Sequence, residues 1–192
     1  MLNNLQKYRI VLGSASPRRK ELLSGLGIPF EVQTIDVEET FPPHLRGIRI
    51  PMYLAEKKAD GFSAQMDDST LLITADTIVL LEEQVLGKPA NREDARKMLK
   101  SLSGKNHLVI TGVCISSLMR RKTFQSVSEV RFAMLKDEEI DFYLDHYEPY
   151  DKAGSYGIQE WIGYVGVEQI NGSFYNVMGL PIQRLYSELK KW

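Results

Sequence analysis

The run "STLLITADTIVLL" at residues 69–81 constrains the fold most, because it is strand-like on both sides of a single acidic residue, Asp76. An apolar, β-branched run of this kind is typical of a buried strand, which needs helices to cover its sheet. An unpaired carboxylate in such a strand would cost several kcal/mol or take up a proton. Asp76 therefore requires a metal ion, a cation or a water-filled cleft beside it. The alternative is a strand end or bulge, with a hydrogen bond through Thr77.

Strand and helix patterns alternate along the first half of the chain. "YRIVLG" (8–13) predicts a buried strand, Pro17 marks the first turn of a helix that Gly25 or Gly27 ends, and "FEVQTI" (30–35) predicts a second strand. The next helices are expected over 48–62 and over 91–104, the latter with Asn91 as its cap and Gly104 as its stop.

The second half is richer in strands. We expect two antiparallel strands at 106–118 and 122–135, a helix at 136–147, further short strands within 161–172 and 173–179, and a closing amphipathic helix after Leu180. No low-complexity linker divides the chain. The sequence thus predicts an α/β protein: one domain over 1–192, with a mixed, twisted central sheet, helices on both faces, and two lobes flanking a cleft.

Composition excludes several classes of protein. The net charge is -1, from 24 basic and 25 acidic residues, so no broad basic field is available to bind nucleic acid. Cys114 is the single cysteine and is expected in the core, which rules out an internal disulfide and a cysteine-built zinc site. No signal peptide or membrane span is recognisable, so we expect a soluble, cytoplasmic protein with no membrane partner.

The stretch "GSASPRRKELL" (13–23) places Arg18, Arg19 and Lys20 in the first turn of a helix, where cations are least favoured. Either this face is solvated or an anion binds there. Lys58 and Lys88 are two further candidates for contact with an anion, although each alone is typical of a solvated surface. Among the carboxylates, Glu38 and Glu39 lie in a loop, and a loop carboxylate beside Asp76 would suit a hard divalent cation such as magnesium.

Other chemistries fit the sequence poorly. It lacks a GxxxxGK[ST] phosphate loop and a GxSxG nucleophile elbow, and His44, His107 and His146 have no metal-ligand spacing. Cations, carboxylates and small-residue turns remain, which is the set of groups that phosphate and metal chemistry needs.

Five separated motifs resemble the Maf-like family of nucleoside triphosphate pyrophosphatases: "SASPRRKELL", "LAEKKA", "ADTIV" followed by "LGKP", "DKAGSYGIQ" and "INGSFYNVMGLP", from about residue 9 to residue 185. The resemblance implies a hydrolase of acid anhydrides that converts a nucleoside triphosphate to the monophosphate and diphosphate. It also implies a divalent metal cation (Mg or Mn), a deep cleft between two lobes, and a homodimer. "GIQ" resembles the subgroup acting on dTTP and UTP, and normal and modified pyrimidine nucleotides both stay open as substrates.

The resemblance also implies roles for individual residues. Asp76 would be the catalytic proton acceptor, and Glu39 would share the metal with it. Substrate choice would depend on Arg19, Thr77 and Gln159, and polar positions lining the nucleotide cleft would be Ser14, Arg18, Lys58 and Lys88. From the residues alone, a hypothesis of another class stays open. The basic turns "PRRK" and "MRRK" would form a surface that binds nucleic acid or protein, on a non-enzymatic regulator of cell division.

Overall fold

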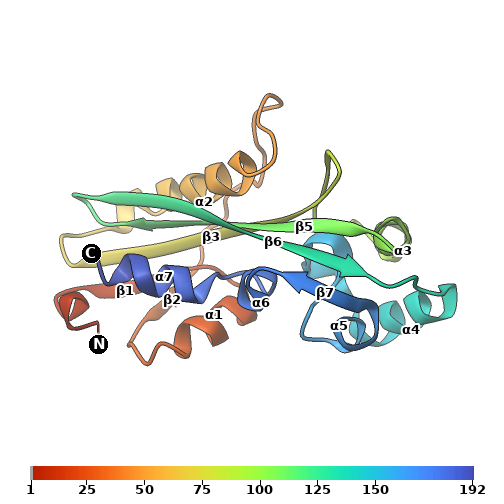
Figure 1. Cartoon of the computed structure of the whole chain (residues 1–192). Helices are drawn as coiled ribbons and strands as arrows, with labels where there is room; N and C mark the ends of the chain where they lie inside the picture. Colours follow the sequence, from red (N-terminus) through yellow and green to blue (C-terminus); the bar gives the residue numbers. More distant parts are fainter. Residues whose placement is uncertain (1) are drawn as a thin grey trace. The chain divides into compact units, whose positions relative to one another are not determined.

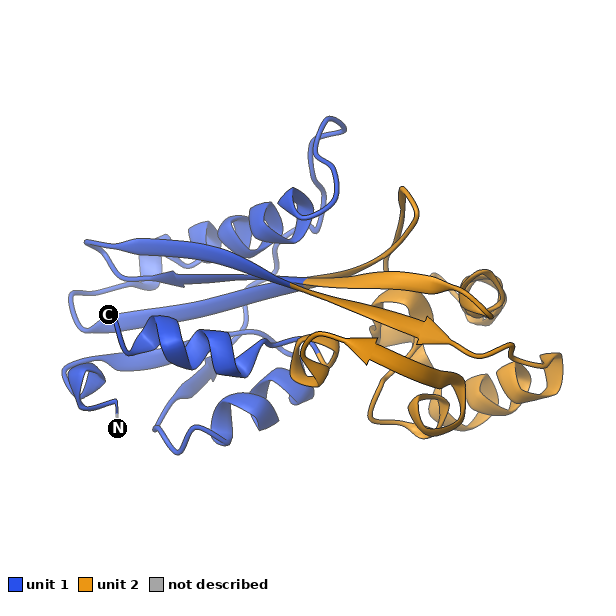
Figure 2. Ribbon diagram, in the orientation of Figure 1, with its two compact units in different colours: residues 1–76, 111–126, 179–192 blue, residues 77–110, 127–178 orange. Residues whose placement is uncertain are grey.

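The computed structural model describes residues 2–192, which form two compact units (Figure 2). The first unit comprises the chain up to Asp76, Thr111–Ser126 and Gly179–Trp192, and the second comprises Thr77–Ile110 and Val127–Met178. The strands form one seven-stranded mixed sheet in the order β2-β1-β3-β5-β6-β7, with β4 paired to β3. The mixed α/β class expected from the sequence is confirmed.

The elements of the first half follow the sequence closely. They are β1 (Arg9–Gly13), α1 (Pro17–Ser24), β2 (Glu31–Gln33), α2 (Arg49–Gly61), β3 (Thr70–Leu81), β4 (Gln84–Leu86) and α3 (Arg92–Leu102). Pro17 is the first residue of α1 and Gly25 caps its end. The Asn91 side chain accepts a hydrogen bond from the Asp94 N–H at 2.9 Å, as a helix cap does. Only β2 is clearly shorter than its sequence pattern predicts.

The later elements are β5 (Asn106–Ser116), β6 (Arg121–Phe132), α4 (Asp137–Tyr147), α5 (Trp161–Gly166), β7 (Val167–Asn171), α6 (Phe174–Val177) and α7 (Ile182–Leu189). Within residues 2–192 no helix has the length and apolar character needed to cross a bilayer.

Of the two segments expected to hold short strands, 161–172 does contain the strand β7 but begins with the helix α5, and 173–179 contains the helix α6 instead of a strand. In Trp161–Gly166, the buried residues Ile162 and Gly166 are four positions apart and therefore lie on the same face of a helix. The aromatic residues of this segment favour strands, which is why a strand was expected. In Phe174–Val177, the Ser173 side chain accepts a hydrogen bond from the Asn176 N–H at 3.3 Å and caps the helix. The serine cap was a signal in the sequence for this second helix.

The first unit is built on parallel pairing. β1 lies between β2 and β3 and is parallel to both, with Leu12 opposite Val32 on one side and opposite Ile73 on the other. α2 covers one side of these strands, and α1 and α7 cover the other (Figure 1). The crossover from β1 to β2 runs through α1, and the crossover from β2 past β1 to β3 runs through α2. Because the two run in opposite directions across the sheet and right-handed connections are the rule, α1 and α2 lie on opposite faces.

A close contact between α2 and the sheet forms the core of this unit. Val11, Leu72 and Cys114 of three strands pack with Ala55 and Ala59 of α2, and all are buried. A side chain at Gly112 would come within 2.5 Å of the α2 backbone, so glycine is required for this approach. Cys114 is a core residue, as expected, and burial raises the pKa of its thiol.

In the second unit, His107 lies in a buried aromatic cluster. Its ring meets Phe132 and Tyr156 edge-on, with centroids 5.1 and 5.4 Å away, and its Nε2 is 2.7 Å from the Tyr156 hydroxyl. Burial lowers the pKa of His107 from 6.5 to about 4. The imidazole is therefore neutral in the folded protein at neutral pH.

This burial predicts a pH-dependent stability. Between pH 6.5 and about 4 the unfolded chain binds a proton at His107 while the folded protein does not. The free energy of unfolding should therefore fall as the pH is lowered through this window, by about 3 kcal/mol in all. Urea unfolding from pH 7 to pH 4 measures it, and His107→Gln should show a shallower fall. Equal slopes in the two proteins would contradict the assignment. The difference between the two proteins isolates His107, because every carboxyl group titrates in both of them.

Candidate functional site

The predicted site residues of the first unit gather where its parallel strands end. β1 leads into Ser14 and the α1 turn, β2 leads into the loop that carries Glu39, and Asp76 lies in β3 three residues beyond Ile73, the partner of Leu12 in β1. The strand order reverses direction between β1 and β3. In open α/β sheets this is the point at which ligands bind, at the carboxyl ends of the strands.

The turn between β1 and α1 is fixed by serine and arginine side chains. Ser14 Oγ accepts hydrogen bonds from the Ser16 N–H and from Arg19 Nη1, both at 3.3 Å. Arg19 Nε also donates to the carbonyl oxygen of Gly179 at 2.8 Å. Arg19 is thus turned inward and held at both ends of its guanidinium. Arg18 stands beside it in sequence, and its positive charge lowers the pKa of Arg19.

One ammonium group joins the two predicted carboxylates. Lys58 of α2 donates to Asp76 Oδ1 at 2.6 Å and to Glu39 Oε1 at 2.8 Å. The side chains of Asp76 and Lys58 are only 9% and 16% exposed, whereas that of Glu39 is 44% exposed. Lys58 is the cation that the buried carboxylate of Asp76 requires. The alternative of a strand end at Asp76 is wrong, because β3 continues to Leu81.

Burial and the neighbouring charges have opposite effects on the pKa values of Asp76 and Arg19. Burial raises the pKa of the Asp76 carboxyl above its ordinary value, and the positive charges of Lys58 and Arg19 offset part of that rise. Burial likewise lowers the pKa of Arg19, and the negative charges of Asp76 and Glu39 oppose the lowering. These four residues therefore form one electrostatic cluster. Such perturbed groups are typical of functional sites.

The two carboxylates of this cluster suit a divalent cation that is also bound by substrate phosphates. Residues 2–192 hold no group of three or more His, Cys, Asp or Glu side chains that could bind a metal by themselves. Magnesium, however, is commonly bound by one or two carboxylates together with substrate phosphates. Glu39 and Asp76 supply such a pair of hard oxygen donors, and they already share one cation, the Lys58 ammonium.

The remaining predicted residues, Thr77, Lys88 and Gln159, belong to the second unit. Gly87, next to Lys88, accepts a hydrogen bond from the Gly154 N–H at 3.0 Å, so the "LGKP" turn lies against the "DKAGSYGIQ" segment. Gln159 is partly buried, and its Oε1 has no hydrogen-bond partner among residues 2–192. A buried amide oxygen without a partner is a ready acceptor for a ligand N–H.

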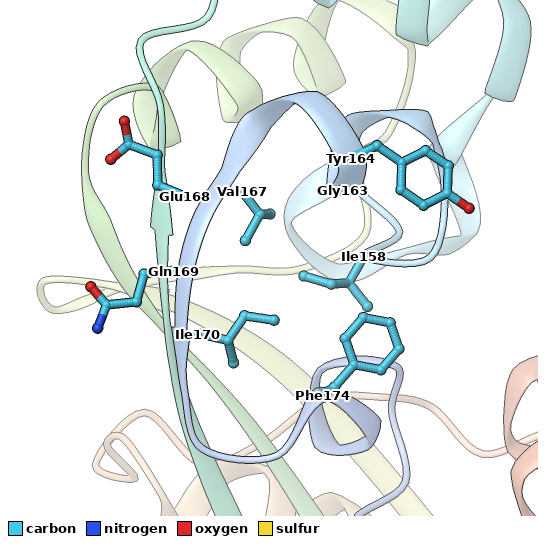
Figure 3. A pocket seen from close by; sticks show the side chains of 8 residues that line it. All are labelled: Ile158, Gly163, Tyr164, Val167, Glu168, Gln169, Ile170 and Phe174. Atoms are coloured by element: carbon cyan, nitrogen blue, oxygen red, sulfur yellow. The ribbon is translucent and has the colours of Figure 1, made fainter.

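An open pocket of about 320 Å³ lies in the second unit, and Ile158, which directly precedes Gln159 in the chain, is one of its lining residues (Figure 3). Ile158, Tyr164, Ile170 and Phe174 contribute its apolar wall. The Tyr164 hydroxyl donates to the backbone carbonyl oxygen of Gln159 at 3.1 Å, which ties the pocket to the Gln159 segment.

Sequence reasoning missed several contacts that hold this site. It gave no role in this site to the Gly179 carbonyl or to Glu160, and it considered Tyr143 only as an aromatic residue of the rival binding surface. Lys152 was recognisable only as half of a charge pair with Asp151, and the structure adds a second partner, Glu160, at 3.1 Å. Glu160 directly follows the motif "DKAGSYGIQ", whereas the contribution of Tyr143 depends on the packing of a distant helix.

Comparison with known proteins settles the family. A profile described as "Maf-like protein" matches residues 9–192. The chain belongs to the Maf-like family. Among its Maf-like relatives, a Phocaeicola vulgatus protein named dTTP/UTP pyrophosphatase is 59% identical over 192 residues, 100% of both chains. Proteins of the same name from Parabacteroides distasonis and Flavobacterium johnsoniae are 60% identical over 191 residues (99% of each chain) and 45% identical over 185 residues (96% and 95%).

Among solved structures, the Ham1 protein of Staphylococcus aureus aligns with this Maf-like chain at a TM-score of 0.45 and 16% identity, over 65% of this chain and 72% of that one. The family assignment does not depend on this weak likeness.

The bridging role of Lys58 predicts a stability effect specific to this lysine. Lys58→Met leaves Asp76 buried without its cation, and the free energy of unfolding should fall by about 3 kcal/mol. Adding Asp76→Asn to Lys58→Met should recover part of the loss, which a double-mutant cycle by urea unfolding measures.

Lys57→Met is the matched control on the same helix, because Lys57 binds only the exposed Thr40, at 3.0 and 3.1 Å. Its effect should stay within about 0.5 kcal/mol. Equal losses for the two lysine variants would contradict the bridging role.

Proposed function

We propose that this protein hydrolyses a nucleoside triphosphate to the monophosphate and diphosphate, with dTTP and UTP as its substrates. The observation that carries the proposal is the buried Asp76 carboxylate, which shares Lys58 with Glu39 at the carboxyl ends of parallel strands. The name dTTP/UTP pyrophosphatase of relatives that match the full chain supports the same reaction. In reaction class the protein would be a nucleoside triphosphate diphosphatase, a hydrolase of acid anhydrides.

The bond between the α- and β-phosphates breaks when a water attacks the α-phosphorus in line with the departing diphosphate. That water needs a base, and Asp76 has one carboxylate oxygen held by Lys58, which leaves Oδ2 to take the proton. The raised pKa of Asp76 suits this role, because a general base works best when its pKa approaches the working pH.

Positive charge on the substrate phosphates would come from Arg18, Arg19, Lys58 and Lys88. Arg19 is already oriented by Ser14 and Gly179, so little conformational entropy is lost when it meets a phosphate. The α1 N-terminus adds backbone N–H groups at the same turn. This accounts for the cations at the start of α1, which would be unfavourable without an anion.

Glu39 and Asp76 are the residues that would hold a magnesium or manganese ion. A bound divalent ion would neutralise phosphate charge and lower the pKa of the attacking water. Lys58 would then be released from at least one carboxylate, and its ammonium would be available to the phosphates.

Gln159 would choose the base. Its side-chain amide offers a donor and an acceptor, the complement of the O4 and N3–H edge that uracil and thymine share. Cytosine presents the reversed pattern and would be rejected if the amide orientation is fixed. The unpartnered Gln159 Oε1 would accept the N3–H.

The rival hypothesis of a basic binding surface finds little support in the "MRRK" turn. Arg120 lies over the Trp192 ring at 4.6 Å and donates to the Lys191 carbonyl, and Arg121 pairs with Asp60 at 2.7 Å. Both arginines are therefore engaged within the protein. The enzyme remains the better proposal.

Diphosphate release from the common nucleoside triphosphates, in the presence of magnesium, tests the proposal. UTP and dTTP should be hydrolysed in preference to CTP, ATP and GTP. Asp76→Asn should lower kcat by about 100-fold or more, because the proposed proton acceptor is lost, while nucleotide binding is largely retained, because the cations proposed to bind the phosphates remain. Asp60→Asn, an exposed carboxylate on α2, is the control. Turnover of UTP by Asp76→Asn at the parent rate would rule out Asp76 as the base.

The magnesium concentration that the enzyme needs should depend on Glu39. Excess EDTA should abolish hydrolysis, and Glu39→Gln should raise the magnesium concentration for half-maximal activity about tenfold or more, because one carboxylate ligand is lost. Glu38→Gln is the matched control from the same loop and should need the same magnesium concentration as the parent. Full activity in EDTA would refute the metal proposal.

A further inference from the structure

The discrimination of uracil from cytosine requires a side-chain amide that cannot turn over, and Gln159 Oε1 has no hydrogen-bond partner among residues 2–192 to prevent this. The partly buried surroundings of the amide must therefore fix its orientation, and they do so only while the Gln159 backbone stays in one place. The residues on both sides of Gln159 are anchored from other elements of the second unit. The inference below rests on the proposed role of Gln159 in choosing the base.

Tyr143 of α4 is the centre of one anchor. Its hydroxyl accepts a hydrogen bond from the Gly157 N–H at 3.0 Å and donates one to Glu160 Oε2. The ring is fully buried. Burial and the Glu160 carboxylate raise the pKa of Tyr143, so the hydroxyl stays protonated and keeps donating to Glu160. The Tyr143 side chain thus holds residues 157 and 160 by hydrogen bonds, and these two residues flank Ile158 and Gln159.

Glu160 is itself fixed by charge. Its Oε1 forms an ion pair with Lys152 Nζ at 3.1 Å, and the same Nζ donates a hydrogen bond to Asp151 Oδ1 at 2.7 Å. The Glu160 N–H donates to the Gly157 carbonyl oxygen at 3.0 Å, which closes a tight turn. Lys152 is buried, so this pair is poorly screened by water.

The second anchor lies on the pocket side. Ile158 is buried, and a side chain at Gly163 would clash with its carbonyl oxygen, so α5 presses against the segment. The Tyr164 hydroxyl holds the Gln159 carbonyl oxygen at 3.1 Å, and Figure 3 shows Tyr164 and Ile158 on the same side of the pocket. The Gln159 backbone is therefore held by hydrogen bonds and packing from two helices.

We propose that Tyr143, acting through Gly157 and Glu160, is a positioning residue for base selection: it holds the Gln159 backbone so that the amide presents one orientation to a pyrimidine. Tyr143 lies outside the motifs that resemble the family. Its loss should leave the chemical step intact and weaken the preference for uracil over cytosine.

Tyr143→Phe tests this, since it removes only the hydroxyl. The binding of UMP and of CMP is measured by calorimetry, and kcat and KM are measured for UTP and CTP. The ratio of CMP to UMP dissociation constants should fall about fivefold to tenfold, which is the range for one lost hydrogen-bonding group. For UTP, KM should rise while kcat stays within about twofold.

Tyr156→Phe is the matched control. It also removes a buried hydroxyl, one that faces His107 at 2.7 Å rather than Gly157 or Glu160. It should lower the thermal stability and leave the UMP-to-CMP preference unchanged. Glu160→Gln keeps an oxygen acceptor for Tyr143 and should preserve most of the preference that Glu160→Ala loses. This pair replaces Tyr143→Phe if that variant does not fold.

An unchanged UMP-to-CMP preference in Tyr143→Phe, an equal loss of kcat for both nucleotides, or a parent that binds UMP and CMP equally would overturn the proposal. Failure of the proposed function gives a different result. If the parent protein releases no diphosphate from any pyrimidine nucleotide, the proposed hydrolysis is refuted. The ratio of the UMP and CMP dissociation constants would still test the role of Tyr143 in base selection.

Discussion

A carboxylate in the middle of a buried strand has to be compensated, and Lys58 provides that compensation for Asp76 at 2.6 Å. The same ammonium binds Glu39, so a loop after β2, a helix and a central strand meet at one charge. The register of α2 against β3, the path of the Glu39 loop and the ionisation of Asp76 all depend on this contact. A buried ion pair of this kind adds little net stability compared with apolar packing. Its value lies in holding reactive groups together.

The topology explains why these groups meet. β1 is flanked by two parallel partners, and the crossovers from β1 to β2 and from β2 to β3 run in opposite directions. The carboxyl end of β1 and the end of its pairing with β3 therefore border the point where the strand order reverses. The residues that follow each strand are brought to this edge whatever their separation in sequence. Gly112 allows α2 to approach the sheet closely, and α2 carries Lys58 to the same edge.

Much of the first half of the chain was predictable from sequence, because its signals are local. The apolar run around Asp76, Pro17 at the start of α1 and the Asn91 cap each act within a few residues. α5 and α6 were wrongly expected as strands, because aromatic and small residues outweighed a helical spacing of only one or two turns. Motif resemblance brought Glu39, Lys58 and Asp76 together as site residues, but it could not show one lysine bridging two carboxylates. That geometry, like the contact of Tyr143 with Gly157, arises only when distant elements pack.

The candidate residues also divide by unit. The carboxylates and Arg19, which suit phosphate chemistry, belong to the first unit, whereas Gln159 and its supports belong to the second. Each group is held by its own contacts, Lys58 and Gly179 in one case and Tyr143 and Tyr164 in the other. Substitutions in the two sets should therefore act on different kinetic quantities, since changes that loosen the segment proposed to select the base would leave the proposed proton acceptor in place. Under this proposal, the nucleotide preference could change through the 157–160 segment while the carboxylates proposed for catalysis stay as they are.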